Sequence, residues 1–250
     1  MKVNKYKKNN NIIHIVEINN LEELKTVINN ANINTIFERN NNFIDDFKSN
    51  ICKLNGYNLD INIRNTKEYN IYGRTILMNK IITQNINCYK NNESNKTINI
   101  YYDLTNKFNS DDNIILNRFI LTYILIMKLK KKNYKVNFIP VLFLKAFDSY
   151  QDNEYVYIKI NNIDIKNIFN YNLILNNKIS RIILPEIIKL LNIENKEALD
   201  YNGYLLERYE KENIIDIKNN DMIIDFFTSE NLFNGNIIDD SEVFYKKLKL

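Results

Sequence analysis

The segment 97–144 constrains the fold more than any other part of the sequence. It begins with an apolar strand pattern that ends at Asp103, passes through a polar loop into an apolar stretch over 114–129, and closes with a second strand pattern over 135–143. A strand, a helix of about five turns and a second strand form a βαβ unit, with parallel strands and a right-handed connection. Ligands of such sheets bind beyond the carboxyl ends of the strands, so Asp103 and Thr105 mark the expected site.

The composition excludes few classes of protein, because 45% hydrophobic and 26% charged residues are ordinary for a globular chain of 250 residues. Heavy use of asparagine, isoleucine and lysine indicates an AT-rich genome. The net charge of +4 is too small to indicate nucleic-acid binding by itself. Cys52 and Cys88 lie far apart without neighbouring ligands, which favours a reducing compartment over a zinc site or a disulfide.

The sequence predicts neither export nor membrane insertion. The polar, lysine-rich start lacks the apolar core and cleavage site of a signal peptide. The most apolar run, 119–127, is too short to span a bilayer and is expected to be a buried helix.

The N-terminal part reads as a small α+β region. Residues 1–11 are expected to be a disordered basic start, followed by a strand at 12–18 and a helix at 20–28 that Asn20 caps. A second helix is expected over 42–54. The polar segment 87–96 is the best candidate linker, so we predict an N-terminal α+β region at 1–93 and an α/β domain at 94–250.

Strand and helix patterns alternate in the C-terminal part, which favours a three-layer α/β domain. We expect strands at 154–160, after a turn over 148–153, and at 221–227, with helices at 163–175, 177–191 and 240–250. Pro185 predicts either a kink in the helix at 177–191 or a helix that starts at the proline.

The order of these segments resembles an uncharacterised protein family, encoded mostly by bacteriophages and prophages, whose C-terminal core is similar to a von Willebrand factor A domain. The short matched segments are 69–89, 98–103, 134–136, 157–160, 180–181 and 221–224. The resemblance implies a three-layer von Willebrand factor A-like (Rossmann-like) domain, a phage origin, and a location in the host cytoplasm or in the virion. The family has no established activity.

Von Willebrand factor A domains often carry a metal-ion-dependent adhesion site that begins with Asp-x-Ser-x-Ser after the first strand. The corresponding residues here are Asp103-Leu104-Thr105-Asn106-Lys107. Asp103 and Thr105 match as oxygen ligands, but Lys107 replaces the last hydroxyl, and an ammonium group cannot bind magnesium. A salt bridge from Lys107 to Asp103 could take the place of the cation, so no cofactor is expected, and a bound magnesium ion is the less favoured alternative.

Other polar residues have simpler expected roles. His14, the single histidine, lies inside a strand pattern and is expected to be structural. Two acidic pairs, Asp111-Asp112 and Asp239-Asp240, precede predicted helices, which favours capping. A lysine cluster ends the central helix, where cations complement the helix dipole or, alternatively, bind phosphate. Its members are Lys128, Lys130, Lys131 and Lys132.

The leading hypothesis is a non-enzymatic module that binds another protein, which is expected to be phage-encoded. Its expected contact residues follow the first strand of the βαβ unit: Asp103, Thr105, Lys107, Ser110 and Asp111. Two alternatives remain open. One is a nucleic-acid-associated protein that uses the lysine cluster, and the other is a divalent-metal-dependent enzyme at Asp103 and Thr105.

Overall fold

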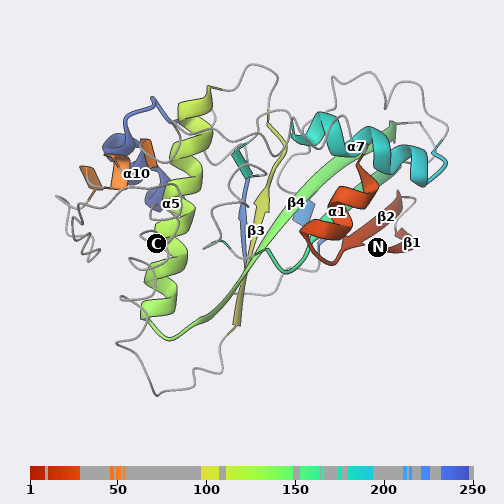
Figure 1. The fold of residues 1–250 in the computed structure, drawn as a ribbon, viewed down its shortest axis with the longest axis horizontal. Coiled ribbons are helices and arrows are strands. Elements are labelled where there is room, and N and C mark those ends of the chain that lie inside the picture. The colour runs from red at the N-terminus through yellow and green to blue at the C-terminus, as the bar shows by residue number, and fades with distance from the viewer. Residues whose placement is uncertain are drawn as a thin grey trace.

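The chain folds around a six-stranded mixed sheet with the strand order β1-β2-β5-β4-β3-β6 (Figure 1). The strands are β1 Lys2–Lys8, β2 Asn11–Ile18, β3 Thr97–Asp103, β4 Lys135–Asp148, β5 Asn153–Ile160 and β6 Met222–Ile224. This computed structural model describes residues 1–8, 11–28, 46–47, 49–51, 53–54, 97–106, 111–148, 153–163, 165, 174–175, 179–193, 211–212, 214–215, 221–225 and 232–247. The α/β class that the sequence predicts is confirmed.

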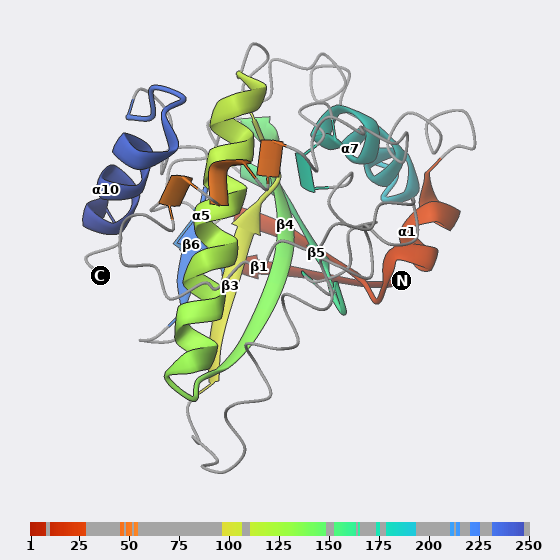
Figure 2. The ribbon, with the colours of Figure 1, turned by 60° about the vertical axis from the view of Figure 1, so that its left-hand side comes forward.

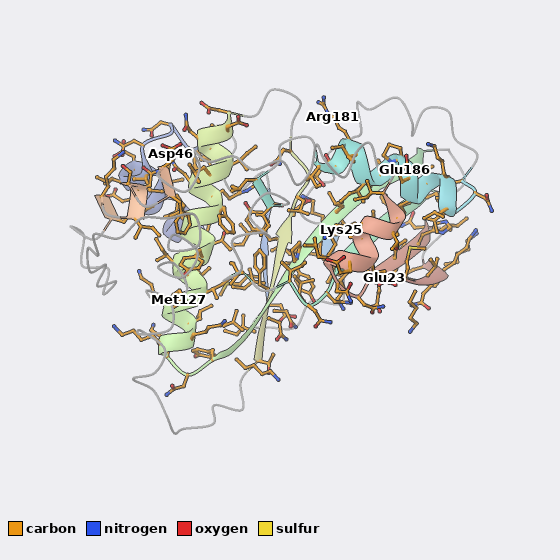
Figure 3. The ribbon with its side chains drawn as sticks, in the orientation of Figure 1. Glu23, Lys25, Asp46, Met127, Arg181 and Glu186 are labelled. Atoms are coloured by element: carbon orange, nitrogen blue, oxygen red, sulfur yellow. The ribbon has the colours of Figure 1, made fainter. Side chains whose placement is uncertain are left out.

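Four helices accompany the sheet in these ranges: α1 Leu21–Val27, α5 Asp112–Lys131, α7 Ile179–Leu190 and α10 Ile237–Lys247. Helix α10 lies beside α5, and α1 lies beside α7 (Figures 1 and 2). The short helical stretch that includes Asp46 lies near α5 and α10 (Figure 3). Within the described ranges, no helix combines enough length and hydropathy to cross a membrane.

The βαβ unit forms as predicted. β3 and β4 are parallel, in a register that pairs Thr97 with Lys135 and Asp103 with Val141. Helix α5 connects them and is apolar on most sides, because it packs against the sheet and also against its helical neighbours. The ring of Tyr123, for example, meets that of Phe47 edge-on at a centroid distance of 5.6 Å.

Successive residues of the strands contribute to two separate cores. Ile100 and Tyr102 of β3 belong to the larger core, which helices α1, α5, α7 and α10 share. Tyr101 belongs to a second core that also includes Phe143, Ile214 and other residues of the opposite face. Side chains of a strand alternate between the two faces of a sheet. Asp103 therefore falls on the face of Tyr101, away from α5.

The prediction of a disordered start over residues 1–11 is wrong. β1 pairs antiparallel with β2, and Lys2 lies opposite Glu17. β1 is the outer strand of the sheet, so it needs only one hydrogen-bonding neighbour, and its exposed lysines are typical of edge strands. Through β2, which is parallel to β5, the N-terminal strands belong to the same sheet as the C-terminal ones. The predicted boundary near residue 93 lies outside the described residues.

The helix boundaries match the predicted ranges to within two residues, apart from those of α10. Helix α7 runs through Pro185, so the alternative of a helix that starts at the proline is wrong. Helix α10 starts at Ile237, three residues earlier than predicted. Asp239 and Asp240 therefore lie in its first turn rather than before it, and the side chain of Asn236 accepts the N–H of Ile238 at the helix start.

Candidate functional site

Two aspartates end neighbouring parallel strands at one edge of the sheet. Tyr102 of β3 pairs with Ile224 of β6, so the residues that follow, Asp103 and Asp225, lie side by side. Both fall on the face away from α5, because Tyr101 and Ile223 pack in the core of that face. Asp103 is 0% and Asp225 is 1% exposed. Two adjacent buried carboxylates repel each other, so this corner requires a positive charge.

Lys211 supplies that charge. Its Nζ lies 2.9 Å from Oδ2 of Asp103 and 3.2 Å from Oδ2 of Asp225, and the side chain is 1% exposed. We call these three residues the Lys211 bridge. Burial alone would lower the pKa of Lys211, but the carboxylates of Asp103 and Asp225 outweigh it and raise the pKa above its ordinary value. Lys211 is therefore an ammonium at neutral pH.

The backbone just after β3 is held by Asp103 itself. Oδ1 of Asp103 accepts the N–H of Thr105 at 2.8 Å, a turn that aspartate side chains commonly form. The N–H of Leu104 donates to the carbonyl of Val141 at 2.9 Å. Oγ1 of Thr105 is buried and has no hydrogen-bond partner in the described part of the chain. Asp103 thus accepts a backbone hydrogen bond with one oxygen and contacts Lys211 with the other.

Arg118 reaches the same strand end from α5. Its Nε donates to the hydroxyl of Tyr102 at 3.2 Å, and its Nη2 donates to Oδ1 of Asn106 at 2.7 Å. The side chain is 1% exposed, and its Nη1 has no partner among the described residues. Burial raises the pKa of Tyr102, although Arg118 opposes this, so the hydroxyl stays protonated. Arg118 thus holds the end of β3 on the face of α5, whereas Lys211 contacts the two carboxylates on the other face.

Of the remaining predicted contact residues, the structure describes Asp111 alone. Asp111 is exposed and caps α5, because its Oδ1 accepts the N–H of Asn113 at 2.8 Å. Lys107 and Ser110 lie outside the described residues, so the predicted salt bridge from Lys107 to Asp103 stays a prediction. The cation that contacts Asp103 in the described structure is Lys211.

The predicted lysine cluster lies at the other end of α5. Lys128 follows Asp112 by 16 residues, or about 24 Å along a helix. Partial burial and the positive charge of Lys132 lower the pKa of Lys128. The members of the cluster, Lys128, Lys130, Lys131 and Lys132, therefore form a surface separate from the Lys211 bridge.

Two other buried polar residues lie away from the bridge. His14 is in β2, and its Nε2 contacts Oε1 of Glu154 in β5. Asp240 of α10 accepts hydrogen bonds from Nδ2 of Asn117 and from the N–H of Asn234, both at 2.8 Å. The prediction that Asp240 caps the helix is thus wrong, because its buried carboxylate instead connects α10 to Asn117 of α5.

The residues at the corner do not fit a magnesium ion. Magnesium requires near-octahedral oxygen ligands at about 2.0–2.1 Å. Nζ of Lys211 lies between the two carboxylates, at the place where such an ion would have to bind. In the described ranges, no group of three or more His, Cys, Asp or Glu residues is arranged to hold a metal.

The prediction from sequence included Asp103 and Thr105 but missed Lys211, Asp225 and Arg118. Asp225 lies inside the apolar pattern at 221–227, which concealed the end of β6 at Ile224. Arg118 had a usable signal, because an arginine in an apolar helix must be buried with hydrogen-bond partners. The sequence offers no comparable signal for Lys211, because this lysine is not part of a periodic pattern.

Comparison with known proteins adds no relative: no protein-family model, no curated protein and no solved structure matches the chain. The fold is that of an α/β protein with a mixed sheet. What its strand-end corner does must therefore be inferred from the geometry of the corner.

Proposed function

We propose that this chain is a non-enzymatic, phage-encoded protein-binding module with a von Willebrand factor A-like core. Its binding surface is formed by the segments that follow β3 and β6, and it binds its partner without a metal ion. The observation that carries this proposal is the Lys211 bridge, because an ammonium group takes the position that a cation would need.

The segment between β3 and α5 supports this surface because both of its ends are fixed. At one end, Asp103 holds the N–H of Thr105, and Arg118 holds Asn106. At the other end, Asp111 caps α5. A short segment between two fixed ends can present side chains to a partner at small entropic cost. Lys107 and Ser110, the contact residues proposed from the sequence, belong to this segment.

Affinity capture from phage-infected host cells tests the proposal. Tagged protein is compared with Lys107→Glu and Asp111→Asn, in EDTA and in magnesium. Asn caps a helix about as well as Asp, so Asp111→Asn removes the charge and keeps the cap. Lys5→Glu, an exposed change on β1 at the opposite edge of the sheet, is the control.

We expect one partner to be captured equally in EDTA and in magnesium, to be reduced by both corner variants, and to be unaffected by Lys5→Glu. Equal capture by all variants would remove the corner as the binding surface. Loss of capture in EDTA would show that a metal is needed.

Nucleic-acid association is a second candidate, favoured by the lysine cluster. Lys128 and Lys132 are four residues apart at the end of α5, so their ammonium groups lie near each other, and a phosphate between them would relieve their repulsion. This function predicts binding to DNA that weakens with salt and when both lysines become glutamine. Absence of binding at low salt would exclude it.

A further inference from the structure

We infer that Lys211 is a built-in cation that keeps a latent divalent-cation site closed, and that the site consists of Asp103 and Asp225. This inference explains the metal independence that the proposed function assumes. Its test requires no binding partner, so the two can fail separately.

The distances place both carboxylates around one point. Oδ2 of Asp103 is 2.9 Å and Oδ2 of Asp225 is 3.2 Å from the same nitrogen atom. Calcium binds oxygen at about 2.3–2.6 Å and magnesium at about 2.0–2.1 Å. An ion at the position of Nζ would therefore require each carboxylate to move by less than about 1 Å for calcium, and somewhat further for magnesium.

The charges lead to the same result. The ammonium of Lys211 carries one positive charge against two carboxylates, and a divalent ion would balance both. Without Lys211, Asp103 and Asp225 would be two adjacent buried anions with no ion between them, an arrangement that proteins avoid. Removal of the lysine side chain therefore creates both a demand for positive charge and the space for an ion with its water ligands.

A further oxygen lies close in the chain. Thr105 follows Asp103 by two residues, and its N–H is held by Oδ1 of Asp103. Its Oγ1 is buried and has no hydrogen-bond partner in the described ranges. Magnesium sites in proteins commonly use one or two carboxylates and several waters, so two aspartates, one hydroxyl and waters suffice.

Thermal melts of Lys211→Ala test this inference. Each melt is recorded in EDTA and with about 10 mM magnesium, manganese or calcium, a concentration at which a millimolar site is mostly filled. The double variant Lys211→Ala/Asp225→Asn is the matched control, because it removes one carboxylate together with the ammonium. Sodium chloride of equal ionic strength controls for screening.

We expect Lys211→Ala to melt well below the unaltered protein in EDTA and to gain about 3–6 °C with at least one divalent ion. The unaltered protein and the double variant should gain nothing, and the double variant should melt above Lys211→Ala in EDTA. If Lys211→Ala is unfolded in EDTA, refolding with a divalent ion should recover it. The inference is overturned if none of the three ions raises the melting temperature of Lys211→Ala or promotes its refolding. It is also overturned if the unaltered protein gains as much in melting temperature.

Discussion

Replacement of Arg118 by methionine should destabilise the protein strongly. Methionine keeps the apolar packing of the side chain but removes the guanidinium group, which holds the hydroxyl of Tyr102 and Oδ1 of Asn106. Both partners are buried, so each lost hydrogen bond leaves a polar atom unpaired at a cost of about 1–3 kcal/mol. The two lost hydrogen bonds together cost about 2–6 kcal/mol.

For a chain of this length, 1 kcal/mol corresponds to about 2–4 °C in Tm, so Arg118→Met should lower Tm by about 4–24 °C. Urea unfolding and thermal melts followed by circular dichroism measure this. Arg181→Met is the matched control: Arg181 is half-buried on α7 and points away from the sheet (Figure 3), and its loss should cost under about 1 kcal/mol. Equal stability of the two variants would refute the view that Arg118 holds the strand end.

Two further predictions concern α1 and α10. Asn20→Ala should lower the unfolding free energy by about 1 kcal/mol, because Oδ1 of Asn20 would no longer accept the N–H of Glu23, whereas Asn20→Ser should change it little; urea unfolding compares them. Burial, the largest cause, raises the pKa of Asp240, so folding favours its protonated form. The associated stability is present below the unfolded pKa of about 3.9 and is lost as the pH rises through the folded pKa. Asp240→Asn should remove the fall in unfolding free energy that accompanies ionisation of Asp240. Identical pH dependence of unfolding in the variant and the unaltered protein would contradict the raised pKa of Asp240.

The local parts of the fold could be predicted from the sequence because their signals lie within a few residues. The alternation that ends at Asp103 and the apolar run of α5 define the βαβ unit, and Asn20 before two glutamates defines the start of α1. β1 could not be predicted in this way. Its residues are lysine-rich and mostly exposed, and only pairing with β2 makes them a strand.

The Lys211 bridge is out of reach of local patterns for a different reason. Asp103 and Asp225 are more than a hundred residues apart in the chain, and they meet because β6 pairs with β3 in one particular register. A shift of that register by one residue would move Asp225 to the other face of the sheet. The sequence predicts a site at Asp103, but only the tertiary structure identifies the cation that contacts its carboxylate.

The protonation state of Lys211 provides the most direct test of the claim that an ammonium group neutralises this corner. The Cε resonances of lysines labelled with ¹³C follow the charge of each side chain as the pH rises, and comparison with Lys211→Arg identifies the signal of Lys211. The pKa of Lys211 is raised above its ordinary value of 10.5, so the bridge contributes stability below that pH and loses it as the pH rises through the folded pKa. We therefore expect Lys211 to remain charged at a pH where exposed lysines have titrated. Titration of Lys211 together with the exposed lysines, or before them, would contradict the account.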